Sequence, residues 1–189
     1  MADGVSYEVP DSALVQKAIE VLRSRLRKRG IAIYVSGIDG SGKTTLAQTL
    51  VETLEASGME ARHLHVYQWY LNIVWTPILL LHNRYVGRKI LVLDRGIYDN
   101  FSVLVARHPF LERISRSAMS AMVALYPRFD YLFYLFAAFP EIIRRRPDTC
   151  ETRYTTLSRI YDAVASRARC VRLHSDRRLF GAALHDIAG

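Results

Sequence analysis

One segment, GIDGSGKT at residues 37–44, decides the fold of this chain. It fits the pattern G-x-x-x-x-G-K-[ST] in full. Its glycines tolerate backbone angles that a side chain forbids, so successive amide N–H groups can turn inward around an anion. The segment therefore predicts a loop that binds the phosphates of a nucleoside triphosphate.

The residues on either side of this loop support the prediction. An apolar run rich in β-formers precedes it at 31–36, and residues 44–57 have helical character. The loop thus opens onto a helix N-terminus, whose partial positive charge favours phosphate. Lys43 is expected to reach the β- and γ-phosphates of ATP, and the Thr44 hydroxyl to ligate Mg²⁺. The residues predicted to bind the nucleotide are Gly37, Asp39, Gly40, Ser41, Gly42, Lys43, Thr44 and Thr45.

A second acidic position follows another buried strand. Residues 89–93 are Lys-Ile-Leu-Val-Leu, and Asp94 ends this run just before Arg95. A carboxylate at the carboxyl edge of a parallel sheet lies where such folds bind ligands. We therefore expect Asp94 to hold Mg²⁺ and Arg95 to lie beside the phosphates, where a guanidinium can bind two oxygens. The alternative is a strand-end ion pair between the two residues.

Expected strands and helices alternate along the whole chain. This order favours right-handed crossovers and one doubly wound α/β domain, a five-stranded parallel sheet flanked by helices. A tail and helix are expected at 1–30, with Gly30 as a left-handed helix end, and the domain at 31–189, with a short lid at about 144–152. The expected strands are 31–36, 61–67, 89–94, 130–136 and 170–173, and the later helices are 44–57, 72–85, 100–106, 111–125, 140–146, 152–167 and 178–187.

Composition limits the other function classes. The chain has 189 residues, a hydrophobic fraction of 50% and a net charge of +8, which suits a single domain with an anionic ligand. Cys150 and Cys170 have no metal-site spacing and are expected to be ordinary thiols. The first residues carry no secretory signal pattern, and no apolar run is long enough to span a bilayer. A cytoplasmic protein without a membrane span is therefore expected.

Two basic segments have both a plain and a functional interpretation. Arginines and a lysine crowd residues 23–29, and three arginines follow one another at 144–146. For 23–29 we favour a solvated helix face over a nucleic-acid or membrane contact, so nucleic-acid binding is not expected. For 144–146 we favour a lid over a solvated helix end.

These motifs together resemble those of thymidylate kinases. The family has an acid at the position of Asp39 and two threonines after the lysine, as residues 37–45 do here. Asp94-Arg95 resembles its second signature, Pro140-Glu141 with Arg146 resembles the start of its lid, and the matches span residues 31–189. The resemblance implies transfer of the γ-phosphoryl of Mg-ATP to a nucleoside monophosphate, and dimers are frequent in the family.

The resemblance also implies roles for individual residues. Asp39 would contact the acceptor's sugar or orient its phosphate, and Arg95 would hold the acceptor phosphate. Arg145 or Arg146 would close over the transferring group. A mobile arginine makes physical sense there, because the transferred phosphoryl spreads negative charge over its oxygens.

The sequence departs from the family on the acceptor side. Ser36 replaces the acid before the first loop glycine, and 67–77 replaces a Pro-Gly-Gly loop. That segment could stack and hydrogen-bond an acceptor, or pack its aromatic rings in the core. Arg84 and Arg88 could meet an acceptor phosphate or stay solvated. The candidate acceptor residues in the segment are Tyr67, Gln68, Trp69, Tyr70, Asn72 and Trp75.

Three further residues, Tyr98, Asp99 and Asn100, are expected to line the acceptor pocket, with Asp99 as a candidate general base. His63 and His65 alternate on the second strand, and we favour structural roles for them over metal binding. The favoured function is a nucleoside monophosphate kinase. The alternatives are a kinase of the same build for a sugar, a nucleoside or another small molecule, and a nucleotide-dependent switch or nucleic-acid-associated ATPase.

Overall fold

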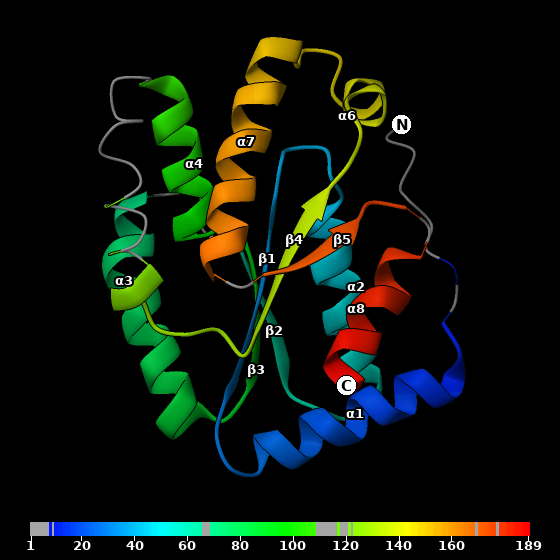
Figure 1. The fold of residues 1–189 in the computed structure, drawn as a ribbon. Helices are drawn as coiled ribbons and strands as arrows, with labels where there is room; N and C mark the ends of the chain where they lie inside the picture. Colours follow the sequence, from blue (N-terminus) through cyan, green and yellow to red (C-terminus); the bar gives the residue numbers. More distant parts are fainter. Residues whose placement is uncertain are drawn as a thin grey trace.

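A five-stranded sheet with all strands parallel forms the centre of the molecule (Figure 1). The computed structural model describes residues 8, 10–65, 69–108, 117, 121, 123–168, 170–176 and 178–189, with side chains except at 69–72. The strand order β2-β3-β1-β4-β5 confirms the doubly wound α/β fold. The strands are β1 (Ile31–Gly37), β2 (Ala61–His65), β3 (Ile90–Asp94), β4 (Tyr131–Phe136) and β5 (Val171–His174).

Helices cover both faces of the sheet, as the alternating pattern predicts. Their bounds agree with the expected ones to within a few residues, except that the expected 111–125 helix lies mostly outside the described residues. The helices are α1 (Ser12–Leu26), α2 (Lys43–Ala56), α3 (Trp69–His82), the π-helix η1 (Asn83–Gly87), α4 (Ile97–Arg107), α6 (Phe139–Arg145), α7 (Glu151–Ala168) and α8 (Leu179–Ala188).

The core consists of two layers, because alternate side chains of each strand point to opposite faces. Ile33 and Val35 of β1 pack with α1, α2 and α8 on one face. Ala32 and Tyr34 pack on the other face with residues of α3, α4 and α7. Figure 1 shows these two groups of helices on either side of the sheet. All seven residues of β1 are buried, which explains its continuous apolar sequence.

The expected left-handed end of α1 at Gly30 is wrong. The helix ends at Leu26 with a right-handed cap at Arg27, and Gly30 does not have a positive φ. A glycine is needed there for another reason, since a Cβ at this position would lie 2.2 Å from the backbone oxygen of Asn83. Gly58, by contrast, follows α2 with a φ of +78°, as expected of a terminating glycine.

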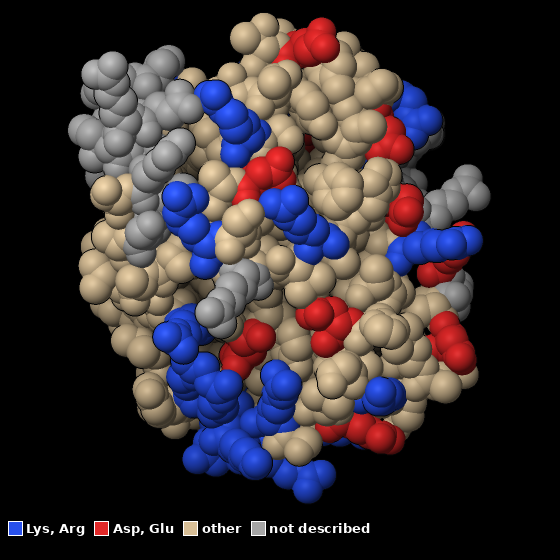
Figure 2. All heavy atoms as spheres, viewed as in Figure 1, with Lys and Arg blue, Asp and Glu red and all other residues tan. Residues whose placement is uncertain are grey.

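The basic segment at 23–29 makes specific contacts with the protein as well as facing solvent. Arg23 donates to the backbone oxygen of Ser57, Arg25 lies over the ring of Tyr131, and Arg29 pairs with Asp130 at 2.6 Å. Figure 2 shows lysines and arginines gathered at this end of the molecule, away from the 37–44 loop. Among the described residues, no helix is long and apolar enough to cross a membrane.

Candidate active site

The phosphate-binding loop joins β1 to α2 and has the backbone that the motif predicts. Gly40 and Gly42 both have φ values of +89°, and Gly42 caps α2 in the left-handed conformation. Only a glycine fits at position 37, because a Cβ there would lie 2.3 Å from the backbone oxygen of Leu135. The loop thus opens onto the N-terminus of α2, where an anion is stabilised by the helix dipole.

Lys43 is folded back over its own loop. Its Nζ donates to the backbone oxygens of Gly37 and Ile38 at 2.7 and 3.0 Å and lies 3.4 Å from Asp39 Oδ1. The side chain is only 5% exposed, so its charge is held inside the loop rather than in solvent. A phosphate entering the loop would offer this ammonium a charged partner in place of neutral carbonyl oxygens.

Thr44 and Asp94 meet as the sequence predicts. The Thr44 hydroxyl donates to Asp94 Oδ2 at 2.5 Å. This hydrogen bond joins the first turn of α2 to the end of β3. Asp94 is fully buried, and its Oδ1 has no hydrogen-bond partner among the described residues. A buried carboxylate oxygen with an unused lone pair beside a hydroxyl is an oxygen donor set that fits Mg²⁺. These two residues would hold the ion, which would neutralise charge on the phosphates.

Asp39 and Arg95 are also brought together. Arg95 donates to Asp39 Oδ1 at 2.6 Å. Burial would raise the pKa of Asp39, but the nearby Lys43 and Arg95 outweigh it and lower the pKa, so the carboxylate is ionised. Arg95 has a φ of +66°, an unfavourable conformation for a non-glycine residue that often marks a functional position. The next residue must be glycine, since a Cβ at Gly96 would lie 2.7 Å from the Tyr34 ring.

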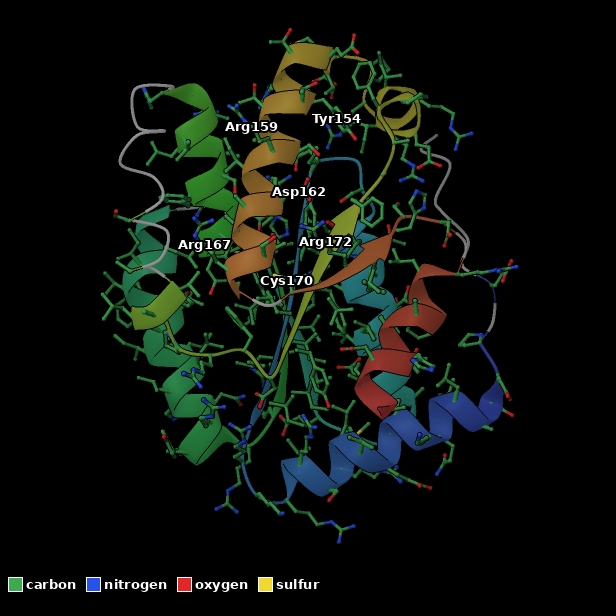
Figure 3. The ribbon with its side chains drawn as sticks, in the orientation of Figure 1. Tyr154, Arg159, Asp162, Arg167, Cys170 and Arg172 are labelled. Atoms are coloured by element: carbon green, nitrogen blue, oxygen red, sulfur yellow. The ribbon has the colours of Figure 1, made fainter. Side chains whose placement is uncertain are left out.

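Two arginines at the C-terminal end of α6 lie beside the phosphate-binding loop. Arg145 donates to the backbone oxygen of Gly40 at 2.8 Å and to the Ser175 hydroxyl at 2.9 Å. Arg146 lies against Gly40, where a Cβ would be 3.3 Å from its side chain. Tyr154 of α7 donates to the backbone oxygen of Ala137 and so ties the start of α6 to α7 (Figure 3). Two of the three predicted lid arginines therefore lie beside the phosphate loop.

Asp99 forms a buried cluster that links three elements. Its Oδ2 accepts from Tyr34 at 2.5 Å, and its Oδ1 accepts from Tyr161 at 2.8 Å and from Ser36 at 3.3 Å. The backbone N–H of Gly37 lies 3.4 Å from the same Oδ1. Burial raises the pKa of Asp99, although Lys43 and these hydrogen bonds oppose the rise. The carboxylate thus supports the first glycine of the loop and contacts Ser36 just before it.

His63 and His65 lie beside Asp94 on the neighbouring strand. His65 pairs with Asp94 in the sheet register, and its Nδ1 is 2.9 Å from Asp94 Oδ2. His63 Nε2 is 3.7 Å from the same oxygen. Burial lowers the pKa of His63, and the neighbouring His65 lowers it further against the opposing effect of Asp94, which favours the neutral ring.

A cavity of about 1250 Å³ opens beside the phosphate loop, between α3, α4 and α7. Asp39 of the loop and Arg95, Asp99 and Asn100 are among the residues that line it. Its described walls are mainly apolar. They also include the basic residues Arg107, His108 and Arg153. The apolar and aromatic residues in the lining are Ile38, Ile73, Pro77, Leu81, Ile97, Phe101, Val103, Leu104, Leu125, Tyr126, Pro127, Leu157 and Tyr161.

Some sequence-predicted acceptor residues lie elsewhere. Arg84 pairs with Asp130, and Arg88 precedes β3, so both are at the opposite end of the strands from the loop. Tyr98 packs against Tyr34 and Phe129 instead of lining the cavity. Trp75 is 62% exposed, so it is not core packing. The predictions for Tyr67, Gln68 and the side chains of Trp69, Tyr70 and Asn72 lie outside the described residues.

Known structures share the fold of this chain. Thymidylate kinase from Candida albicans has a TM-score of 0.61 at 16% identity, over 84% of this chain and 91% of that one. Polyphosphate kinase 2 from Arthrobacter aurescens TC1 has a TM-score of 0.56 at 10% identity, over 94% of this chain and 74% of that one. The chain shares its fold with these two kinases. No protein-family model and no curated protein matches the sequence.

The fold also places at the site residues that the sequence alone does not indicate as functional. Arg107 and Arg153 line the cavity from α4 and α7, and Tyr34 and Tyr161 hold Asp99. The two arginines and Tyr161 lie in the amphipathic helices α4 and α7, and Tyr34 lies in the buried strand β1. Their local sequence therefore resembles that of ordinary surface and core residues. No local signal marks them, because their positions depend on how the helices pack across the sheet.

Proposed function

We propose that this chain is an ATP-dependent phosphotransferase that transfers the γ-phosphoryl of Mg-ATP to a nucleoside monophosphate. The observation that carries the proposal is the cavity that opens at the phosphate loop, lined there by the contacting pair Arg95 and Asp39. An acceptor phosphate held by Arg95 would lie next to the γ-phosphate on the loop. A bidentate guanidinium–phosphate contact would hold the acceptor in the orientation that the reaction needs.

The proposed chemistry needs little beyond positioning and charge. The attacking phosphate oxygen of a monophosphate is already anionic, so no general base is required. Asp99 is 5% exposed and accepts hydrogen bonds on both oxygens, which suits a supporting residue better than a base. Lys43, Arg145 and Arg146 would neutralise the charge that spreads over the transferring group.

A second candidate is a kinase for a small molecule other than a nucleoside monophosphate, such as a sugar or a nucleoside. The observation that favours it is the apolar described wall of the cavity, including Ile73, Leu81, Leu104 and Leu125. Apolar side chains hold an acceptor by burial rather than by hydrogen bonds to a base edge. The Candida albicans thymidylate kinase is described as having broad substrate specificity, so a pocket of this fold is not tied to one acceptor.

The test is ADP formation from Mg-ATP with a panel of acceptors and a control without acceptor. The panel holds the nucleoside monophosphates, including dTMP, with nucleosides and common sugars. Strong stimulation by one monophosphate supports the first candidate and identifies the base. ATP binding without stimulation by any monophosphate refutes it, and stimulation by a nucleoside or sugar then supports the second candidate. Hydrolysis that no acceptor changes contradicts both.

A further inference from the structure

The cluster of His63, His65 and Asp94 contains three potential metal ligands within a small space. The three ligand atoms, one from each residue, all lie within 4.8 Å of one another. Phosphoryl transfer uses only the oxygen ligands of Thr44 and Asp94, so it gives the two imidazoles no role. We propose that His63, His65 and Asp94 bind a divalent transition-metal cation, of the kind represented by Zn²⁺ or Co²⁺.

The distances within the cluster fit this chemistry. Tetrahedral zinc ligands at about 2.0–2.1 Å from the metal stand about 3.3 Å apart. Here Asp94 Oδ2 is 2.9 Å from His65 Nδ1 and 3.7 Å from His63 Nε2. These two separations lie on either side of the ideal value, and the separation between the two histidine ligand atoms is within 4.8 Å. Side-chain rotations would bring the three ligands to one metal ion. The fourth position is open to water, as in sites that exchange ligands.

The fold holds the three ligands in this arrangement. His63 and His65 are two residues apart on β2, so their side chains share one face of the strand. His65 is directly opposite Asp94 of β3 in the parallel register. The histidine side chains are 22% and 21% exposed, whereas Asp94 is fully buried. Because β2 is the edge strand, a cation could reach the imidazoles from solvent.

An unused lone pair points to a ligand. His63 Nε2 is a buried atom with no hydrogen-bond partner among the described residues. Buried polar atoms normally have partners, and leaving one unsatisfied costs about 1–3 kcal/mol. A bound cation would use the unsatisfied His63 nitrogen and the Asp94 carboxylate.

The donor set selects the kind of cation. Mg²⁺ prefers oxygen ligands and retains several waters, whereas imidazole nitrogen suits zinc and its neighbours in the first transition series. The proposed site shares Asp94 with the expected Mg²⁺ position, where Thr44 approaches Oδ2. Its existence does not depend on the proposed function, because binding can be measured without any nucleotide.

The first experiment is a titration of the nucleotide-free full chain, made without a polyhistidine tag. Zn²⁺ binding is followed by calorimetry and Co²⁺ binding by its visible absorption. We expect one equivalent to bind, and His63→Asn and His65→Asn each to weaken binding at least about tenfold. His185→Asn is the matched control, because His185 is exposed on α8, and it should bind as the wild type does. Thermal unfolding of each variant checks that it is folded.

The second experiment uses the wild-type chain alone. Nitrogen NMR of the histidine rings should show that Zn²⁺ shifts the resonances of His63 and His65 and leaves that of His185 in place. The proposal fails if the wild type shows neither heat nor a Co²⁺ absorption band. It also fails if His63→Asn binds as tightly as the wild type, or if the two ring resonances do not move.

Discussion

At the scale of single residues, Lys43 carries the most direct prediction. Its Nζ is held by two loop carbonyl oxygens and is expected to move onto the nucleotide phosphates. We expect Lys43→Ala to lower the rate of ADP formation by at least about 10²- to 10³-fold, as loss of one charge-stabilising group does elsewhere. Thermal unfolding should show an intact fold. Lys28→Ala, at an exposed position, is the control, and turnover retained in the Lys43 variant would refute the phosphate assignment.

Asp94 gives a second residue-scale prediction. Its carboxylate meets the Thr44 hydroxyl at 2.5 Å and is expected to hold Mg²⁺. Asp94→Asn removes the negative charge but keeps the shape, so it should lower the rate and weaken the dependence of the rate on Mg²⁺ together. Rates measured over a Mg²⁺ titration check this. An unchanged Mg²⁺ midpoint would show that another carboxylate holds the ion.

Asp99 predicts a pH dependence of folding stability. Burial raises its pKa, so the folded chain binds this proton more tightly than the unfolded chain does. The stability that it contributes is therefore fully present below the ordinary carboxyl pKa and is lost as pH rises through the raised pKa. Asp99→Asn lacks this titration. Denaturant unfolding of both proteins between about pH 4 and pH 8 should show the wild type losing stability relative to Asp99→Asn; a constant difference would contradict the expectation.

The residue scale also shows where sequence analysis reaches its limit. The 37–44 loop could be predicted because phosphate binding imposes glycines, a lysine and a threonine at consecutive positions. The Asp99 cluster could not be predicted, because Tyr34 and Tyr161 come from β1 and α7 and their tyrosine identity does not indicate their partner. The sequence likewise does not show that Asp94 is opposite His65 in the sheet register, which brings both histidines close to this carboxylate.

At the scale of elements, helix α6 carries the arginine that contacts the phosphate-binding loop. Arg145 and Arg144 are neighbours on this helix, but Arg145 contacts Gly40 and Ser175 whereas Arg144 is exposed. Arg145→Ala should therefore slow transfer, by about 10³-fold if it acts as arginines of this kind do on transferred phosphoryls. Arg144→Ala is the matched control and should change the rate little. Equal effects of the two variants would show that α6 contributes only bulk charge.

Most helices and strands of the fold could be predicted from the sequence. Apolar runs located the strands, and capping residues located helix ends, as Asp11 does by accepting from the N–H of Ala13. The failure at Gly30 has a physical cause. The sequence shows only that a glycine is present there, and the structure shows that the close approach of Asn83 in η1 requires it rather than a left-handed helix end. The sequence leaves Arg84 and Arg88 open between an acceptor contact and solvation for a similar reason, since distance along the chain does not say which end of the sheet a turn occupies.

At the scale of the whole molecule, the phosphate loop and the basic segment lie at different ends. Lysines and arginines gather around the end of α1, while the loop and the cavity lie at the carboxyl edge of the sheet (Figures 1 and 2). The +8 charge therefore says little about the site. If the basic end bound nucleic acid, the affinity would fall steeply with salt, whereas phosphotransfer in the cavity would not require that surface.

The position of the cavity gives the last prediction. Leu104 of α4 lines it, whereas Leu79 of α3 is 40% exposed and is not among the lining residues. Leu104→Trp should fill part of the acceptor space and raise the KM for the acceptor roughly 5- to 150-fold, the equivalent of about 1–3 kcal/mol of overpacking. The KM for ATP should stay the same, because the phosphate loop is not touched. Leu79→Trp is the matched control, and initial rates with each substrate varied in turn separate the two constants. If both tryptophan variants raise the KM equally, or if Leu104→Trp changes only the KM for ATP, the acceptor does not bind in this cavity.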